Sequence, residues 1–140
     1  MKSVAPRLLF TLFTASLGTS AAAADLTVEV DGVESDGGSV AVAVFTSAED
    51  FPNKVAHGQR VKAAGQKAVV VFKDLPAGRY AVSAYHDAND NRQLDRGMFG
   101  IPKERYGFSQ EARGVGGPPE FRDAAFALPA EGARISVHVR

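Results

Sequence analysis

The chain has 140 residues, with 16 basic and 16 acidic side chains and no cysteine. Its length suits one domain behind a short leader. Without the first 24 residues, which include Lys2 and Arg7, 14 basic residues face 16 acidic ones. A net charge of about −2 gives no electrostatic footprint for nucleic acid or for an anionic membrane, although the arginines of the second half could form a local patch. The lack of cysteine excludes disulfides, thiol catalysis and thiolate metal sites, so packing or a bound metal must stabilise the domain.

Residues 1–24 have the three parts of a secretory signal peptide. Lys2 and Arg7 form the positive start, residues 8–17 form the apolar middle, and the alanines at 22–24 form the cleavage motif. Threonine and serine dilute the apolar run, which falls short of the roughly 20 apolar residues that span a bilayer. We therefore expect cleavage after Ala24, a mature domain of residues 25–140 in the periplasm or outside the cell, and no membrane insertion after cleavage.

Apolar and polar residues alternate along much of the mature chain, a pattern typical of half-buried strands. Leu26, Val28 and Val30 show it first. Residues 40–45 are apolar at every position, which predicts a central strand covered on both faces. Further strands are predicted at residues 57–62, 67–72, 79–86, 123–128 and 134–139. No convincing helix is predicted, so we expect a single small all-β sandwich of about seven strands.

The segment LPAGRY, residues 75–80, predicts a corner between two strands. Pro76 fixes one backbone dihedral, and Gly78 permits a positive φ. Tyr80 follows the corner, where its hydroxyl is expected to bond the loop backbone, as in the tyrosine corner of Greek-key sandwiches. This turn resembles the one found in transthyretin-like exported domains.

One long loop, residues 87–119, precedes the last two predicted strands and has no sustained periodicity. Loops beyond about 15 residues are uncommon in compact domains and are usually functional or disordered. Phe99, Tyr106 and Phe108 favour an ordered loop, because aromatic rings anchor a segment by packing. We expect Phe99 and Phe108 to be buried anchors.

The start of this loop has oxygen-bearing side chains at alternate positions: Asp87, Asn89, Asn91, Gln93 and Asp95. Calcium binds about six to eight oxygen ligands, and EF-hand-type loops supply them at similar spacing. In such a loop Gln93 would contribute its backbone carbonyl. The pattern therefore indicates a structural calcium site.

Two departures weaken this match. The sixth position, usually glycine, is Arg92, and the twelfth, usually glutamate, is Met98. A site here would bind calcium weakly, with a Kd of roughly 10⁻⁴–10⁻³ M. The alternative is a turn in which Asp and Asn side chains bond their own backbone. Both interpretations remain open.

Basic and aromatic side chains mix in the second half of the loop, where Arg105, Tyr106 and Arg113 are the predicted ligand contacts. Such residues bind peptides, glycans or the surface of an envelope protein. The alternative is a loop whose rings pack inward while its arginines lie in water.

Catalytic motifs are weak in this sequence. No serine lies in a G-x-S-x-G turn. His86 and Asp87 are neighbours on a predicted strand, so their side chains point to opposite faces. We therefore expect His86 to be solvated or bonded for structural reasons.

Many of these segments together resemble an exported bacterial family, numbered 2141 among domains of unknown function. The motifs are DLTV at 25–28, AVF at 43–45, FP at 51–52, DLPAGRY at 74–80, HD at 86–87, LD at 94–95, FGIP at 99–102, YGFS at 106–109 and FRDAAF at 121–126. The resemblance covers nearly the whole mature chain. It implies an envelope or secreted protein with an immunoglobulin- or transthyretin-like sandwich, and no established activity. The acidic loop of the family often has glycine where this chain has Arg92, which weighs against a metal site here.

Together these features favour an exported, non-enzymatic binding or structural module. The long loop would present the contact surface to an envelope protein, peptide or glycan. The alternative is a small envelope hydrolase that uses carboxylates or His86 in that loop. The fold class hosts both kinds of function and does not separate them.

Overall fold

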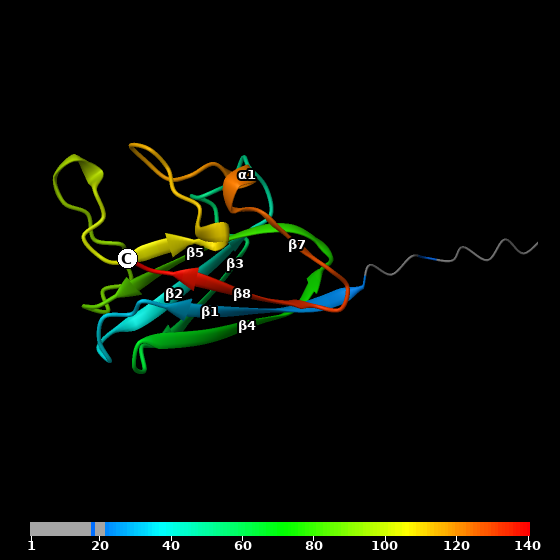
Figure 1. Ribbon diagram of the computed structural model, residues 1–140, viewed down its shortest axis with the longest axis horizontal. Helices are drawn as coiled ribbons and strands as arrows, with labels where there is room; N and C mark the ends of the chain where they lie inside the picture. The colour runs from blue at the N-terminus through cyan, green and yellow to red at the C-terminus, as the bar shows by residue number, and fades with distance from the viewer. Residues whose placement is uncertain (1–17, 19–21) are drawn as a thin grey trace, which may run out of the picture.

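The computed structural model describes Gly18 and residues 22–140 and shows two sheets packed face to face (Figure 1). The first sheet has the strand order β4-β1-β8, with bounds Lys67–Pro76, Ala23–Asp31 and Ala133–His138. β1 runs antiparallel to β4 and parallel to β8. The predicted signal peptide lies almost entirely outside the described residues.

The second sheet has the order β3-β2-β5-β6, with bounds His57–Lys62, Ser39–Phe45, Gly78–Asp87 and Tyr106–Phe108. Neighbouring strands are antiparallel, and β7 (Phe126–Leu128) pairs with the start of β5. This arrangement confirms the predicted all-β sandwich.

The core between the sheets is built from alternate residues of facing strands. Leu26, Val28 and Val30 of β1 are fully buried, while the residues between them remain partly exposed. Val40 and Val44 of β2 meet them from the opposite sheet. Burying such a side chain contributes about 1.5–3 kcal/mol, so the period-two pattern fixes which face of each strand turns inward.

A second apolar group, the outer aromatic cluster, covers the other face of the second sheet. It consists of Phe45, Phe51, Phe108 and Phe121 together with small alanines. The Phe51 ring packs edge-on against Phe45 at 5.1 Å, Phe108 at 5.7 Å and Phe121 at 6.0 Å between centroids. Because β2 is covered on both faces here, its continuous apolar run is confirmed as that of a central strand.

The long loop contains regular structure that its sequence did not reveal. β6 lies within it, as do two 3₁₀ turns, η1 (Met98–Gly100) and η2 (Ser109–Glu111). Beyond its pairing with β5, Tyr106 exchanges backbone hydrogen bonds with Arg140, which closes this edge of the sandwich. A Cβ on Gly107 would collide with the carbonyl oxygen of His138, so the approach of the two sheets depends on glycine.

The strand predicted at residues 123–128 is wrong at its start. Phe121–Ala124 form a single helical turn, α1, and only Phe126–Leu128 pair as a strand. The helical turn places Phe121 and Ala124, three residues apart, on one side, where both join the outer aromatic cluster. Within the described part of the chain, no helix has the length and apolar character needed to cross a membrane.

The tyrosine corner is confirmed, and its energetic role is testable. Tyr80 donates its hydroxyl hydrogen to the Pro76 carbonyl at 2.5 Å, and burial raises the pKa of Tyr80, which keeps the donor protonated. We expect Tyr80→Phe to lower the free energy of unfolding by about 1 kcal/mol, measured by urea unfolding. Tyr106→Phe is the matched control, since the Tyr106 hydroxyl has no hydrogen bond within the described residues, and it should leave stability unchanged. Equal stability of the Tyr80 variant and wild type would contradict a structural role.

Candidate functional site

The long loop is fixed at its start by the buried carboxylate of Asp87, the last residue of β5. Asp87 is 0% exposed. Its carboxylate accepts a hydrogen bond from Arg60 Nη1 at 2.6 Å and from the backbone N–H groups of Asn91 at 3.1 Å and Arg92 at 2.8 Å. One buried charge thus pairs with a cation and caps two donors, the condition under which a buried carboxylate is tolerated.

Arg60 reaches this carboxylate from β3, two strands away. The register aligns Arg60 with Ala41 of β2 and Ala41 with Tyr85 of β5, so the small alanine leaves room for the long side chain. Arg60 Nη2 donates to the Tyr85 hydroxyl at 3.0 Å. Burial opposes the charge of Arg60, but the hydrogen bonds to Tyr85 and Asp87 outweigh it and raise its pKa, so the guanidinium remains charged.

Two further contacts extend the same network to the loop. Arg60 Nη1 also donates to Ser39 Oγ at 2.7 Å, and Ser39 Oγ donates to Asp90 Oδ1 at 2.7 Å. Asp90 and Arg92 both have a left-handed backbone, with φ of 55° and 65°. Arg92 thus adopts, at the sixth position of the loop, the conformation that glycine supplies in calcium loops.

A second carboxylate, that of Asp95, organises the middle of the loop. Its two oxygens accept the side-chain amides of Asn89 at 2.6 Å and Asn91 at 2.7 Å. Glu104 joins the two ends of this segment, since its oxygens accept the N–H groups of Ala88 and Asp95, both at 3.1 Å. The acidic side chains therefore serve as acceptors for the loop itself.

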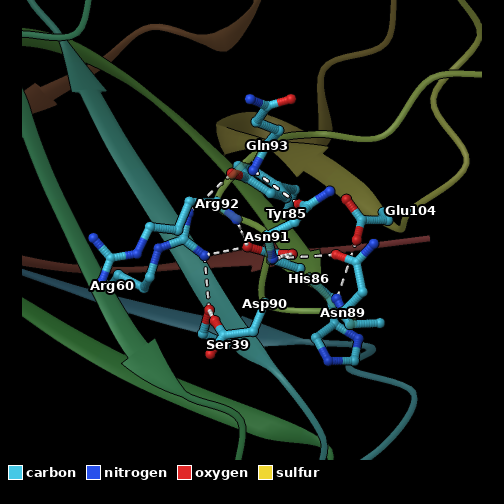
Figure 2. Close-up of polar contacts among 12 residues, drawn as sticks. Ser39, Arg60, Tyr85, His86, Asn89, Asp90, Asn91, Arg92, Gln93 and Glu104 are labelled. Carbon is cyan, nitrogen blue, oxygen red and sulfur yellow. Dashed lines mark hydrogen bonds and ion pairs between the residues drawn. The ribbon is translucent and has the colours of Figure 1, made fainter.

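The structure brings four of the predicted calcium ligands, Asp87, Asn89, Asn91 and Asp95, into one hydrogen-bonded turn. The fifth, Gln93, donates its backbone N–H to Asn91 Oδ1 at 3.0 Å, and Figure 2 shows its side chain directed away from the network. No group of three or more acidic or histidine side chains suited to a metal occurs among residues 22–140. These are the bonds of the Asx-rich turn, and the calcium site remains a prediction.

His86 is separate from this network. The residue is 3% exposed, and its Nε2 lies 2.7 Å from the carbonyl oxygen of Gly37, which lies outside β5. Asp87 bonds different partners on the opposite face of the strand. A structurally bonded histidine is therefore confirmed.

The predicted ligand contacts separate into two places. Tyr106 and Arg113 line one cavity of about 180 Å³, together with Phe108, Glu111 and Arg140. The cavity lies between β6 and the following turns, and it combines two cations with one acid and two rings. Arg105 lies elsewhere and forms a partly exposed ion pair with Glu34 at 3.3 Å.

Residues 96–102, in the middle of the long loop, form a small hairpin with an apolar tip. Met98, Phe99 and Ile101 are exposed to 79%, 93% and 64% of their surface, and we call these three residues the apolar tip. The expectation that Phe99 is a buried anchor is wrong. Phe108, also expected to be buried, is only partly buried, but it packs against the outer aromatic cluster. Phe99 occupies a tight turn with φ of 62°, which directs it away from the sheets.

Several features of the site were absent from the sequence predictions. Arg60 is one, since a lone arginine in a polar strand gives no sign of its partner. The exposure of Met98 and Ile101 is another. The network members that the sequence did not indicate also include Ser39, Tyr85, Asp90 and Glu104. A signal for the tip did exist: the segment between Arg96 and Lys103, GMFGIP, combines large apolar residues with two glycines and a proline in a span too short to fold back onto a core.

The Asp87–Arg60 pair should dominate the stability of this region. We expect Asp87→Ala to lower the free energy of unfolding by about 3 kcal/mol, because it leaves a partly buried guanidinium and two backbone donors unpaired. Glu29→Ala is the matched control, because it breaks an exposed pair with Arg134 and should cost less than about 1 kcal/mol. Urea unfolding of both variants measures the difference, and an Asp87 variant as stable as the control would show that the pair does not anchor the loop.

Comparison with known proteins gives one match. A family model described as "Uncharacterized protein conserved in bacteria (DUF2141)" matches residues 28–136. No curated protein and no solved structure matches the chain. The match runs from β1 into β8 and includes the whole long loop. The chain therefore belongs to this bacterial family, as its motifs predicted.

Proposed function

We propose that this protein is an exported, non-enzymatic binding module, periplasmic or secreted, whose contact surface is the outer part of the long loop. The exposed apolar tip is the observation that carries the proposal. Leaving a large apolar side chain in water forgoes about 1.5–3 kcal/mol of burial energy. Three such residues grouped on one hairpin are typical of an interaction site.

The order of the hairpin supports a role in binding. Arg96 and Pro102 form a β-bridge, and the Arg96 guanidinium donates to the Gly100 carbonyl at 2.9 Å. The backbone N–H of Lys103 donates to the Asp95 carbonyl at 2.8 Å and closes the neck. A contact surface held in place before binding loses less conformational entropy when the partner arrives.

The carboxylates favour this role over the alternative of a hydrolase. Asp87, Asp95 and Glu104 each accept hydrogen bonds that hold the loop backbone or its amides. His86 bonds a backbone carbonyl on the far side of β5. The hydrogen bonds of these three carboxylates and of His86 therefore hold the fold of the loop and of its surroundings.

The binding role is tested by removing the apolar tip. We expect the triple variant Met98→Ser, Phe99→Ser, Ile101→Ser to bind at least about tenfold more weakly than wild type, since central apolar contacts each contribute more than about 1 kcal/mol. Binding is measured against three fractions of a bacterial envelope: membranes, soluble proteins and cell-wall glycans. Val115→Ser is the control, because Val115 is equally exposed but lies on another turn. A triple variant that binds as wild type does, or a wild type that no fraction retains, would contradict the proposal.

We propose that the leader is removed on export by cleavage after Ala24. Ala23 and Ala24 are the first two residues of β1, so the mature strand would begin at Asp25. We expect intact mass and N-terminal sequencing of the exported protein to give Asp25 as its first residue. A full-length chain held in the membrane would overturn the assignment.

The calcium hypothesis keeps one supporting observation, the glycine-like backbone of Arg92. Calcium at ten times its Kd would stabilise the domain by about 1.4 kcal/mol, a rise in Tm of roughly 4–8 °C. We expect this rise at millimolar calcium and its loss in Asp95→Asn, with magnesium as the control ion. Asp95 is the better position to change, because Asp87 is needed for stability whether or not metal binds. An unchanged Tm would leave the Asx-rich turn as the sole interpretation.

A further inference from the structure

We propose that the apolar tip docks on the surface of an anionic phospholipid bilayer. The inference rests on the proposed function, in which the tip is the contact surface, and it specifies the partner. Docking of this kind places the tip among lipid headgroups and leaves the sandwich in water.

The shape of the tip suits a bilayer. The hairpin projects clear of both sheets, at the upper left of Figure 1 in yellow-green. Its three large side chains are exposed to 64% or more of their surface at the end of this projection, and none belongs to either apolar cluster of the protein. A projecting apolar end needs a matching pocket on a protein partner, whereas a fluid lipid interface adapts to it without one.

Several backbone polar groups of the tip are hydrogen-bonded within the hairpin, as an environment with little water requires. The N–H of Gly97 donates to the Ile101 carbonyl at 2.7 Å, and the N–H of Gly100 donates to the Gly97 carbonyl at 3.3 Å. Arg96 bonds the Gly100 carbonyl from the side. Unpaired backbone groups are strongly unfavourable in the apolar part of a bilayer, and these internal bonds remove several of them.

The charges at the neck select an anionic surface. Arg96 and Lys103 flank the tip, and the sequence between them contains no acidic residue. Within residues 22–140, neither cation forms an ion pair. The acids Asp95 and Glu104 adjoin these cations in the chain and keep their negative charges. Their carboxylates accept hydrogen bonds from the Asn89 side chain and the Ala88 backbone in the base of the loop, so Arg96 and Lys103 are the charged residues next to the apolar tip.

The position of Lys103 fits the same surface. Its side chain passes close to Gly97, where an added Cβ would lie 3.2 Å from Lys103 Cε. Such a stem can follow the apolar tip while the ammonium group meets the headgroups. Each basic residue near an anionic leaflet strengthens binding about fivefold. The apolar tip and its basic neck together therefore match negatively charged headgroups better than zwitterionic ones.

Tryptophan fluorescence provides a direct test, because the chain has no native tryptophan. Phe99→Trp in the mature protein places a single reporter at the tip. We expect its emission to shift to shorter wavelength with vesicles of phosphatidylethanolamine and phosphatidylglycerol. The shift should be weaker with phosphatidylcholine vesicles and should decrease as salt is added. Val115→Trp, on an exposed turn outside the tip, should keep the emission of a ring in water.

Vesicle sedimentation of variants that have no added tryptophan separates the apolar contribution of the tip from the charge contribution of Lys103. We expect Met98→Ser with Phe99→Ser to weaken binding to both vesicle types at least about tenfold. Lys103→Gln should weaken binding about fivefold to phosphatidylglycerol vesicles only. Val69→Ser is the control for a general loss of surface apolarity, since Val69 is half exposed on β4.

The outcomes distinguish the partner from the general function. If the emission wavelength of the Phe99→Trp variant does not shift, or if binding does not depend on lipid charge and salt concentration, the lipid proposal is overturned. If the tip variants at the same time lose binding to a soluble protein or glycan fraction, the tip is still a contact surface and only the partner is wrong. If the tip variants change binding to no fraction and no vesicle, both proposals fail.

Discussion

The structure of the long loop depends on one buried ion pair, that of Asp87 with Arg60. A carboxylate with no exposed surface must keep its partner, because an uncompensated buried charge is strongly destabilising. The same carboxylate accepts two backbone N–H groups from the first turn of the loop. It therefore couples β3 and β5, which are not neighbours, to the path of the chain after β5. The acceptor groups of Asp95 and Glu104 build the rest of the loop on this start.

The outer face of the second sheet explains where the loop goes next. Along β2 and β5 the paired residues change from polar to apolar: Ser39 with Asp87, Ala41 with Tyr85, Ala43 with Ser83, and Phe45 with Ala81. The chain leaves the sheet at the charged end, passes through the tip and returns as β6. It then covers the apolar end with Phe108 and Phe121. One face of one sheet thus supplies both the anchor of the loop and the apolar surface that receives its return.

Local sequence was sufficient to predict a strand wherever buried residues recur with the two-residue period of a strand. The alternation in β1 and the apolar run in β2 predict their strands because each residue faces a core on a known side. The corner before Tyr80 was predictable too, since its turn and hydroxyl partner lie within a few residues. β6 was not predictable, because its three residues become a strand only by pairing with β5. Arg60 could not be assigned for the same reason: its partner is 27 residues away, and only the register brings them together. The spacing grouped the turn residues Asp87, Asn89, Asn91 and Asp95, and the structure brings them into one hydrogen-bonded turn. Calcium binding by this turn stays a prediction.

The exposure of Phe99 follows from the contacts that order the loop. The backbone bond from Lys103 to Asp95 closes the neck, so the few residues beyond it cannot reach the sheets. Phe108 lies after the neck, on a segment already paired with β5, and it packs into the outer aromatic cluster. Two phenylalanines of similar intrinsic preference therefore have opposite environments because of where the chain is closed. A loosely held loop would let Phe99 collapse onto the nearest apolar surface, as the burial energy of a phenylalanine favours. The closed neck prevents this collapse, and the hydrogen bonds that hold the neck therefore keep the apolar tip exposed to solvent.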